Sequence, residues 1–253
     1  MDLFDLKNKT VLITGSSQGL GLAIGEGLGQ AGAKVVLNGR NRDKLDKAKE
    51  SLVAKGIDAA AYSFDVTVEE EVSKGVEKIE KEAGPIDILV NNAGINLRGP
   101  LEDCEADTWH KVIDLNLNAV FYVSKTVGKY MIDRKQGKII NIASLLSEAA
   151  RPTIAPYTVS KGGVKMFTKA LAVEWAKHNI QVNAIGPGFF ITEMTKPLVE
   201  DKKFDAWVRE RTPLGKWGDP SELVGASVFF ASSASNFVTG QVLYVDGGWL
   251  AAL

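Results

Sequence analysis

The sequence predicts an α/β fold, a doubly wound sheet of seven mainly parallel strands flanked by helices on both faces. Short runs rich in β-branched residues alternate with helical patterns of about 10 to 25 residues, as in parallel sheets. A glycine-rich segment follows directly behind the first run. No internal repeat, low-complexity tract or linker divides the chain. We therefore expect residues 1–253 to form one domain.

The predicted strands are apolar runs, as expected for a parallel sheet that is covered on both faces. They span residues 9–14, 34–38, 59–64, 86–90, 138–143, 180–185 and 242–245. Helical spacing of apolar residues predicts helices over 19–31, 43–54, 69–82, 108–134 and 155–178. The least regular stretch, 186–218, follows a strand end, where open α/β sheets bind ligands. We expect it to act as a lid over a pocket.

The composition is that of an ordinary globular protein, with 45% hydrophobic and 24% charged residues and a formal net charge of -1. This balance offers no basic surface for nucleic acid or an anionic membrane. The single Cys104 excludes an internal disulfide, and His110 and His178 lack metal-ligand spacing, so no metal is expected. No targeting segment and no apolar run of roughly 18 residues is present, so we expect a soluble, cytoplasmic protein.

A glycine-rich turn between the first strand and the first helix is a candidate phosphate site. It comprises Thr14, Gly15, Ser16, Ser17, Gln18, Gly19, Leu20 and Gly21. Glycines let backbone N–H groups approach a pyrophosphate, and the helix N-terminus adds partial positive charge. The spacing differs from the strict G-x-G-x-x-G and Walker patterns, and a tight turn without a ligand could also use these glycines. Its position between strand and helix favours dinucleotide binding.

The end of the second strand favours NADP over NAD, although NAD remains possible. Arg40 follows Asn38 there, and no acidic residue is in reach. A carboxylate at this place would accept a hydrogen bond from a ribose 2′-hydroxyl, whereas a guanidinium pairs with a 2′-phosphate. We expect Arg40 to be the main discriminator, with Ser16, Ser17 and Asn38 as helpers. A surface arginine without this role is the alternative.

Tyr157 and Lys161 form a candidate acid–base pair. They are four residues apart behind Pro156, which can open a helix, so both side chains would emerge from one helix face. A neighbouring ammonium favours a phenolate and would lower the tyrosine pKa from about 10. Such a tyrosine can exchange a proton with an alcohol or a carbonyl. Chance alone yields such a spacing often, so this pair needs support from other motifs.

Further motifs supply that support, and together they resemble the short-chain dehydrogenase/reductase family. Besides the glycine turn and the Tyr157–Lys161 pair, they are Asp65-Val66, Asn91-Asn92-Ala93-Gly94, Asn116, Ser144, and Pro187-Gly188 with Thr192. The likeness spans essentially the whole chain. It implies a Rossmann-like fold, a homotetramer, and hydride transfer between NAD(P) and a carbonyl or alcohol.

The resemblance also implies roles for individual residues. Tyr157 would donate and accept the proton, and Lys161 would hold the nicotinamide ribose and depress the tyrosine pKa. Ser144 would hold the substrate oxygen, and Asn116 would anchor a water that relays protons. The remaining cofactor contacts would come from Asp65 and Val66 at the adenine, from Asn92, Ala93 and Gly94 at the inner ribose, and from Pro187, Gly188, Ile191 and Thr192 at the nicotinamide.

Within the family, the sequence is most similar to gluconate 5-dehydrogenases and slightly less so to 2-deoxy-gluconate 3-dehydrogenases. Those enzymes often carry two arginines after the Asn-Asn-Ala-Gly motif, and here Leu97 replaces the first while Arg98 keeps the second. Arg98 is a candidate for binding a substrate carboxylate, because arginine can do so bidentately. An ion pair elsewhere is the alternative. Substrate contacts are also expected from Ser144, Leu146, Ser147, Glu148 and Tyr157.

Other functions stay open at this point. The chain could reduce another ketone, such as a 3-oxoacyl thioester or a diketone. An acyl-carrier substrate would favour a basic patch near the pocket entrance, for which Arg98 and Arg151 offer weak support. A catalytically silent nucleotide sensor is the alternative from another class, but every chemical residue is present. The apolar faces of 108–134 and 155–178 and the tail 249–253 are expected subunit contacts.

Overall fold

The sheet of the computed structural model has seven strands within the described residues, 2–252, and all of them are parallel. The strands are β1 (Thr10–Ile13), β2 (Lys34–Asn38), β3 (Ala59–Tyr62), β4 (Ile86–Asn91), β5 (Gly137–Ile142), β6 (Ile180–Pro187) and β7 (Val242–Val245). Their order is β3-β2-β1-β4-β5-β6-β7, which confirms the predicted doubly wound α/β fold. Met1 and Leu253, the ends of the predicted domain, lie outside the described residues.

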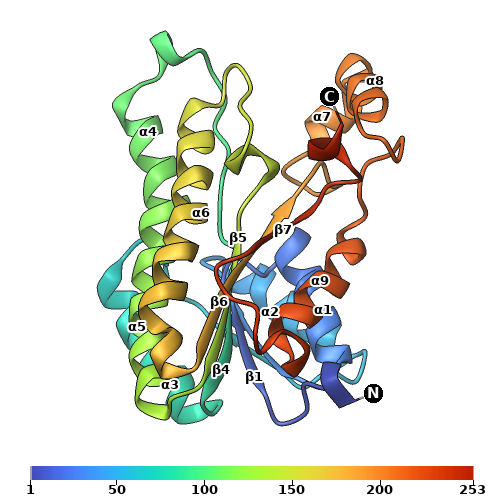
Figure 1. Ribbon diagram of the computed structural model, residues 1–253. Coiled ribbons are helices and arrows are strands. Elements are labelled where there is room, and N and C mark those ends of the chain that lie inside the picture. The colour runs from blue at the N-terminus through green and yellow to red at the C-terminus, as the bar shows by residue number, and fades with distance from the viewer. Residues whose placement is uncertain (1, 253) are drawn as a thin grey trace.

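Helices cover both faces of the sheet (Figure 1). One face carries α1 (Gly19–Gln30), α2 (Arg42–Val53) and α9 (Val224–Ala231), and the other carries α3 (Glu69–Glu82), α4 (Ala106–Ile113), α5 (Ala119–Arg134) and α6 (Ala155–Trp175). The central strands are apolar on both sides because each side faces a helical layer. Leu28 and Phe230 are buried in one layer, and Val76 and Val123 in the other. None of the helices described is long and apolar enough to cross a membrane.

The predicted helix over 108–134 contains an irregular turn. The helical run begins at Ala106 and passes through a π turn, Asp114–Asn118, before it continues as α5. No glycine or proline lies in this turn, so nothing in the sequence pattern indicates it. π turns insert a residue into the helix and are frequent at functional sites, and this one holds the buried Asn116.

The segment 186–218 lies at the carboxyl end of the sheet, beside the C-terminal segment (Figure 1). It contains α7 (Lys196–Glu200) and α8 (Lys202–Arg211). A cluster of aromatic rings packs these helices onto the chain end, with centroids 4.9 to 6.3 Å apart. Its members are Phe189, Phe204, Trp207, Trp217 and Trp249. The Trp217 indole also donates a hydrogen bond of 2.7 Å to Asp205 on α8.

Candidate active site

A cleft of about 550 Å³ opens at the carboxyl ends of the strands, where the strand order reverses between β1 and β4. Most of the residues predicted for cofactor and catalysis line it. They are Gly15, Ser17, Gln18, Gly19, Leu20, Asn38, Arg40, Val66, Asn92, Ala93, Gly94, Ser144, Tyr157, Lys161, Pro187, Gly188 and Thr192. The fold therefore brings together motifs that lie more than 170 residues apart in the sequence, from Gly15 to Thr192.

The glycine turn has the open backbone that a phosphate site needs. Gly15 and Gly19 both have a φ of 61°. A Cβ on Gly15 would lie 2.7 Å from the Cα of Ala93, and a Cβ on Gly21 would collide with the Asn92 amide. Asn92 donates hydrogen bonds to the carbonyls of Thr14 and Gly15, at 3.0 and 2.9 Å, and so holds the turn in place. The turn then leads directly into the N-terminus of α1.

Ser16 and Asn38, two residues predicted to help bind the 2′-phosphate, form hydrogen bonds within the protein. The Ser16 hydroxyl is buried, donates to the carbonyl of Ile13 and accepts from the backbone N–H of Asn38. The Asn38 amide donates to the carbonyls of Tyr62 and Phe64, each at 3.2 Å. Both side chains therefore tie β1, β2 and the segment after β3 together, and their predicted contact with a 2′-phosphate stays untested.

Two cations lie where an adenosine ribose would be expected. Arg40 is largely exposed, lines the cleft and forms an ion pair of 3.3 Å with Asp65. Burial would raise the pKa of the Asp65 carboxyl, but hydrogen bonds from Thr67 and then the Arg40 charge lower it overall. Lys44 lines the same end and donates to the Gln18 side chain. Sequence reasoning missed Lys44, because it belonged to a charged helix that looked like a solvated face. The pair makes this end of the cleft suitable for an extra phosphate.

Tyr157 and Lys161 meet at the other end of the cleft, as predicted. Pro156 lies in the first turn of α6, and the Lys161 Nζ is 5.7 Å from the centroid of the Tyr157 ring. Lys161 is only 4% exposed and donates a hydrogen bond of 2.6 Å to the carbonyl of Ile142, at the end of β5. The lysine therefore reaches across from the helix to the strand end, beside the phenol.

The predicted lowering of the Tyr157 pKa is wrong. Burial raises the pKa of Tyr157, against the lowering effects of a hydrogen bond with Ser144 and of the Arg98 charge. Burial also lowers the pKa of Lys161 to about 8. The sequence showed the two groups as neighbours but not that Lys161 is buried and Tyr157 partly buried, and desolvation opposes the charged form of each. The phenol is thus held in its protonated form.

Asn116 is fully buried in the π turn, and its amide is bound by protein groups. Its Oδ1 accepts from the backbone N–H of Ile95 at 2.8 Å, and its Nδ2 donates to the carbonyl of Ile95 and to Ser160. Asn116 thereby fixes the loop after β4 against α6. Its predicted role as the anchor of a water stays a prediction, since these contacts already satisfy the amide.

Several predicted residues do not line the cleft, namely Ser16, Gly21, Asp65, Arg98, Asn116, Leu146, Ser147, Glu148 and Ile191. The Ser147 hydroxyl donates to the carbonyl of Lys161 at 2.8 Å. Glu148 pairs with Lys165 and accepts a hydrogen bond of 2.8 Å from Tyr244, and Ile191 is 49% exposed. The structure gives Ser147 and Glu148 internal partners, and their substrate contacts remain predictions. Residues that sequence reasoning did not assign include Ile95, Leu115 and Phe190, whose apolar side chains resemble core.

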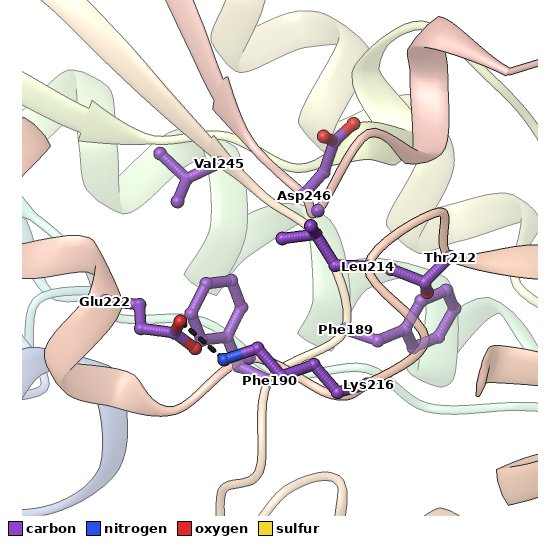
Figure 2. Close-up of a pocket in the computed structure, with 10 residues that line it drawn as sticks. Phe189, Phe190, Thr212, Leu214, Lys216, Glu222, Val245 and Asp246 are labelled. Carbon is purple, nitrogen blue, oxygen red and sulfur yellow. Dashed lines mark hydrogen bonds and ion pairs between the residues drawn. The ribbon is translucent and has the colours of Figure 1, made fainter.

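A second, smaller cavity of about 80 Å³ lies beneath the segment 186–218 (Figure 2). Its lining is mainly apolar, with Phe189, Phe190, Leu214 and Val245. Lys216 crosses it and pairs with Glu222 at 2.7 Å, which neutralises both charges. Among the described residues, no group of three or more His, Cys, Asp or Glu side chains could hold a metal ion. The chemistry-bearing groups therefore gather in the larger cleft.

Known proteins resemble this chain over its whole length. A family model described as enoyl-(acyl carrier protein) reductase matches residues 15–250. The chain is 52% identical over 252 residues to a 5-keto-D-gluconate 5-reductase of Escherichia coli, with coverage of 100% of this chain and 99% of that protein. It is 51% identical over 255 residues to a 2-dehydro-3-deoxy-D-gluconate 5-dehydrogenase of Formosa agariphila, with coverage of 100% and 97%.

A solved structure is similarly close. A gluconate 5-dehydrogenase from Burkholderia cenocepacia, in complex with NADP and tartrate, has a TM-score of 0.97 and 47% identity, and the match covers 100% of this chain and 99% of that one. These matches extend over the glycine turn, the Tyr157–Lys161 pair and the segment 186–218. The chain belongs to the short-chain dehydrogenase/reductase family.

Proposed function

We propose that this protein is an NADP-dependent oxidoreductase that interconverts a hydroxyl and a ketone of a sugar acid, with gluconate and 5-keto-gluconate as the substrate pair. One observation carries the proposal: a single cleft has Arg40 and Lys44 at one end and Ser144, Tyr157 and Lys161 at the other. The relatives support the substrate, because a 5-keto-D-gluconate 5-reductase and a gluconate 5-dehydrogenase are each about half identical to this chain.

The cleft fits a dinucleotide. The positions of Gly15 and Gly21 exclude a Cβ, so the backbone of the turn can contact a pyrophosphate. Arg40 would pair with the 2′-phosphate, Val66 and Asp65 would flank the adenine, and Thr192 would contact the carboxamide. The NADP in the relative's structure supports this choice of cofactor. A bound nicotinamide supplies the hydride acceptor for the alcohol or the hydride donor for the ketone.

The proton moves through Tyr157. In ketone reduction the Tyr157 hydroxyl gives its proton to the oxygen that forms the new alcohol and becomes a phenolate, and in alcohol oxidation the Tyr157 phenolate takes the proton of the substrate hydroxyl. Ser144, which lines the cleft together with Tyr157, would hold the substrate oxygen. The raised pKa of Tyr157 keeps the phenol protonated, which suits it as the acid in the reducing direction. Lys161 would hold the nicotinamide ribose.

Two further parts of the prediction belong to this proposal. The segment 186–218 acts as a lid, because Thr192, Met194 and Thr195 line the cleft from it and would shield the reacting atoms from water. The working form is a homotetramer, for which the exposed apolar side chains of Met166 on α6 and Phe121 on α5 are candidate contacts.

A second candidate substrate is 2-dehydro-3-deoxy-D-gluconate, the substrate in the name of the relative from Formosa agariphila. This sugar acid would undergo the same reaction at the same carbon position, so the catalytic residues do not distinguish between the two candidate substrates. Purified protein should be assayed with NADP or NADPH and each sugar acid, with the absorbance of reduced nicotinamide as readout. We expect the highest kcat/KM with gluconate and 5-keto-gluconate. Turnover of neither sugar acid would contradict the proposed function.

A further inference from the structure

Two loops that carry arginines are joined by a backbone hydrogen bond. One follows β4 and carries Arg98, and the other precedes α6 and carries Arg151. The backbone N–H of Gly99 donates a hydrogen bond of 3.0 Å to the carbonyl of Thr153. Thr153 has a φ of 68°, a conformation that is costly for a β-branched residue. Thr153 therefore accepts the hydrogen bond that links the two arginine-carrying loops, and it does so from a strained backbone conformation.

Aromatic rings of α8 hold both guanidinium groups. The Cζ of Arg151 is 4.7 Å from the centroid of the Phe204 ring and 5.1 Å from that of Trp207. The Cζ of Arg98 is 5.9 Å from the same Phe204 ring. Cation–π contacts use the face of a guanidinium and leave its N–H edges free to donate. Neither arginine forms an ion pair with a carboxylate within residues 2–252.

The two positive charges affect each other and the active site. Burial lowers the pKa of both groups, and the charge of Arg98 lowers the pKa of Arg151 further. The charge of Arg98 also acts on Tyr157 and tends to lower the pKa of the phenol. Two like charges that are partly desolvated and lack a counterion repel each other, and an anion between them would relieve that repulsion. The two guanidinium groups therefore present an arrangement that an anion would stabilise.

We propose that Arg151 acts with Arg98 as a two-arginine clamp for the carboxylate of the substrate, and that α8 forms the wall of this subsite. The inference rests on the proposed function, and it adds Arg151 as a residue that determines specificity for acids. The carbon chain of a sugar acid would extend from the clamp toward Tyr157. The clamp also explains how a single arginine after the Asn-Asn-Ala-Gly motif suffices, because the second guanidinium comes from a different loop.

The test compares Arg151→Gln and Arg151→Lys with the wild type on gluconate and on the uncharged gluconamide. Arg151→Gln should raise the KM for gluconate about ten- to a hundredfold, as expected for the loss of a charged hydrogen bond, and should change kcat far less. Arg151→Lys should recover part of the loss. Turnover of gluconamide should be poor and equal in wild type and Arg151→Gln. The KM for NADP, measured in parallel, reports on folding of the cleft.

Arg211→Gln is the matched control. Arg211 also stacks on the aromatic cluster, with its Cζ 5.3 Å from the Trp249 centroid, but it donates to the carbonyl of Ala252 and belongs to neither of the two joined loops. It should change gluconate and gluconamide kinetics equally. A KM for gluconate in Arg151→Gln within about twofold of wild type, or equal losses on both substrates, would overturn the clamp alone. A wild-type enzyme that oxidises no sugar acid would overturn the proposed function and the clamp with it.

Discussion

The chemistry of the cleft depends on two side chains whose charged forms are opposed by burial. The pKa of Tyr157 is raised and the pKa of Lys161 is lowered to about 8, so near neutral pH the phenol is protonated while the lysine is still largely charged in an environment that opposes its charge. Their neighbours compensate in different ways: Ser144 and the Arg98 charge favour the phenolate, while the carbonyl of Ile142 accepts from the lysine. Burying these groups therefore lowers the free energy of unfolding, and this effect can be measured.

Replacing Lys161 by methionine should stabilise the fold at neutral pH and abolish activity. The folded pKa lies below the unfolded value of 10.5, so the unfolded chain binds more protons between about pH 8 and 10.5, and wild-type stability rises with pH across that window. Below it the buried charge costs up to about 3 kcal/mol, less about 1 kcal/mol for the hydrogen bond that methionine loses.

Urea unfolding at several pH values checks this prediction. The advantage of Lys161→Met should be largest near neutral pH and shrink as the pH approaches 10.5. Lys138→Met is the control, since burial also lowers the pKa of Lys138 to about 8 but its side chain contacts Ser235 and not the cleft. It should show the same pH trend and keep its activity. A difference in stability that does not depend on pH would contradict the assignment.

Arg40 should decide the choice of cofactor. Its guanidinium is exposed at the cleft, and its one ion pair among the described residues is with Asp65. The remaining N–H groups can therefore donate to a 2′-phosphate. Arg40→Asp should shift the ratio of kcat/KM for NADP over NAD by at least about tenfold toward NAD. Arg42→Asp, at a neighbouring position whose arginine pairs along α2 with Asp46, should leave the ratio unchanged. Equal ratios in Arg40→Asp and wild type would remove Arg40 from the cofactor site.

At the scale of elements, the glycine turn between β1 and α1 is the part that the sequence described best. Its φ values and its position required nothing beyond local glycine chemistry. The π turn and the internal bonding of Ser16 and Asn38 were not predictable, because both depend on partners that are distant in the sequence. Helix α9 was also missed, since its apolar residues give no amphipathic pattern.

Gly15→Ala should damage this element specifically. An added Cβ would lie 2.7 Å from the Cα of Ala93 and would force alanine into a φ of 61°. We expect a loss of about 1 to 3 kcal/mol in the free energy of unfolding and weaker NADP binding, measured by urea unfolding and by quenching of tryptophan fluorescence. Gly225→Ala, where no atom lies within 4 Å of the new Cβ, should fall within about 1 kcal/mol of wild type. Equal effects at both positions would contradict this account.

At the scale of the whole molecule, the strand order determines where the site lies. The chain leaves β1 toward β2 and β3, then returns to β4 on the other side, and the cleft opens at that reversal. The alternation of strands and helices was enough to predict a parallel sheet with helices on both faces, because parallel strands need helical crossovers, whereas the family resemblance implied the Rossmann-like arrangement. The depth of the cleft was not predictable, since the burial of Tyr157 and Lys161 depends on the loop after β4, on β5 and on α6 together.

The central claim is that the Tyr157 hydroxyl moves the proton that accompanies hydride transfer between NADP and a sugar acid. The most direct measurement is the single-turnover rate of NADPH oxidation by 5-keto-gluconate in wild type and in Tyr157→Phe, which removes only the hydroxyl. We expect turnover by the wild type and a loss of about 10² to 10⁴-fold in the variant, with NADPH binding retained. A Tyr157→Phe enzyme that reduces the ketone as fast as the wild type would contradict it.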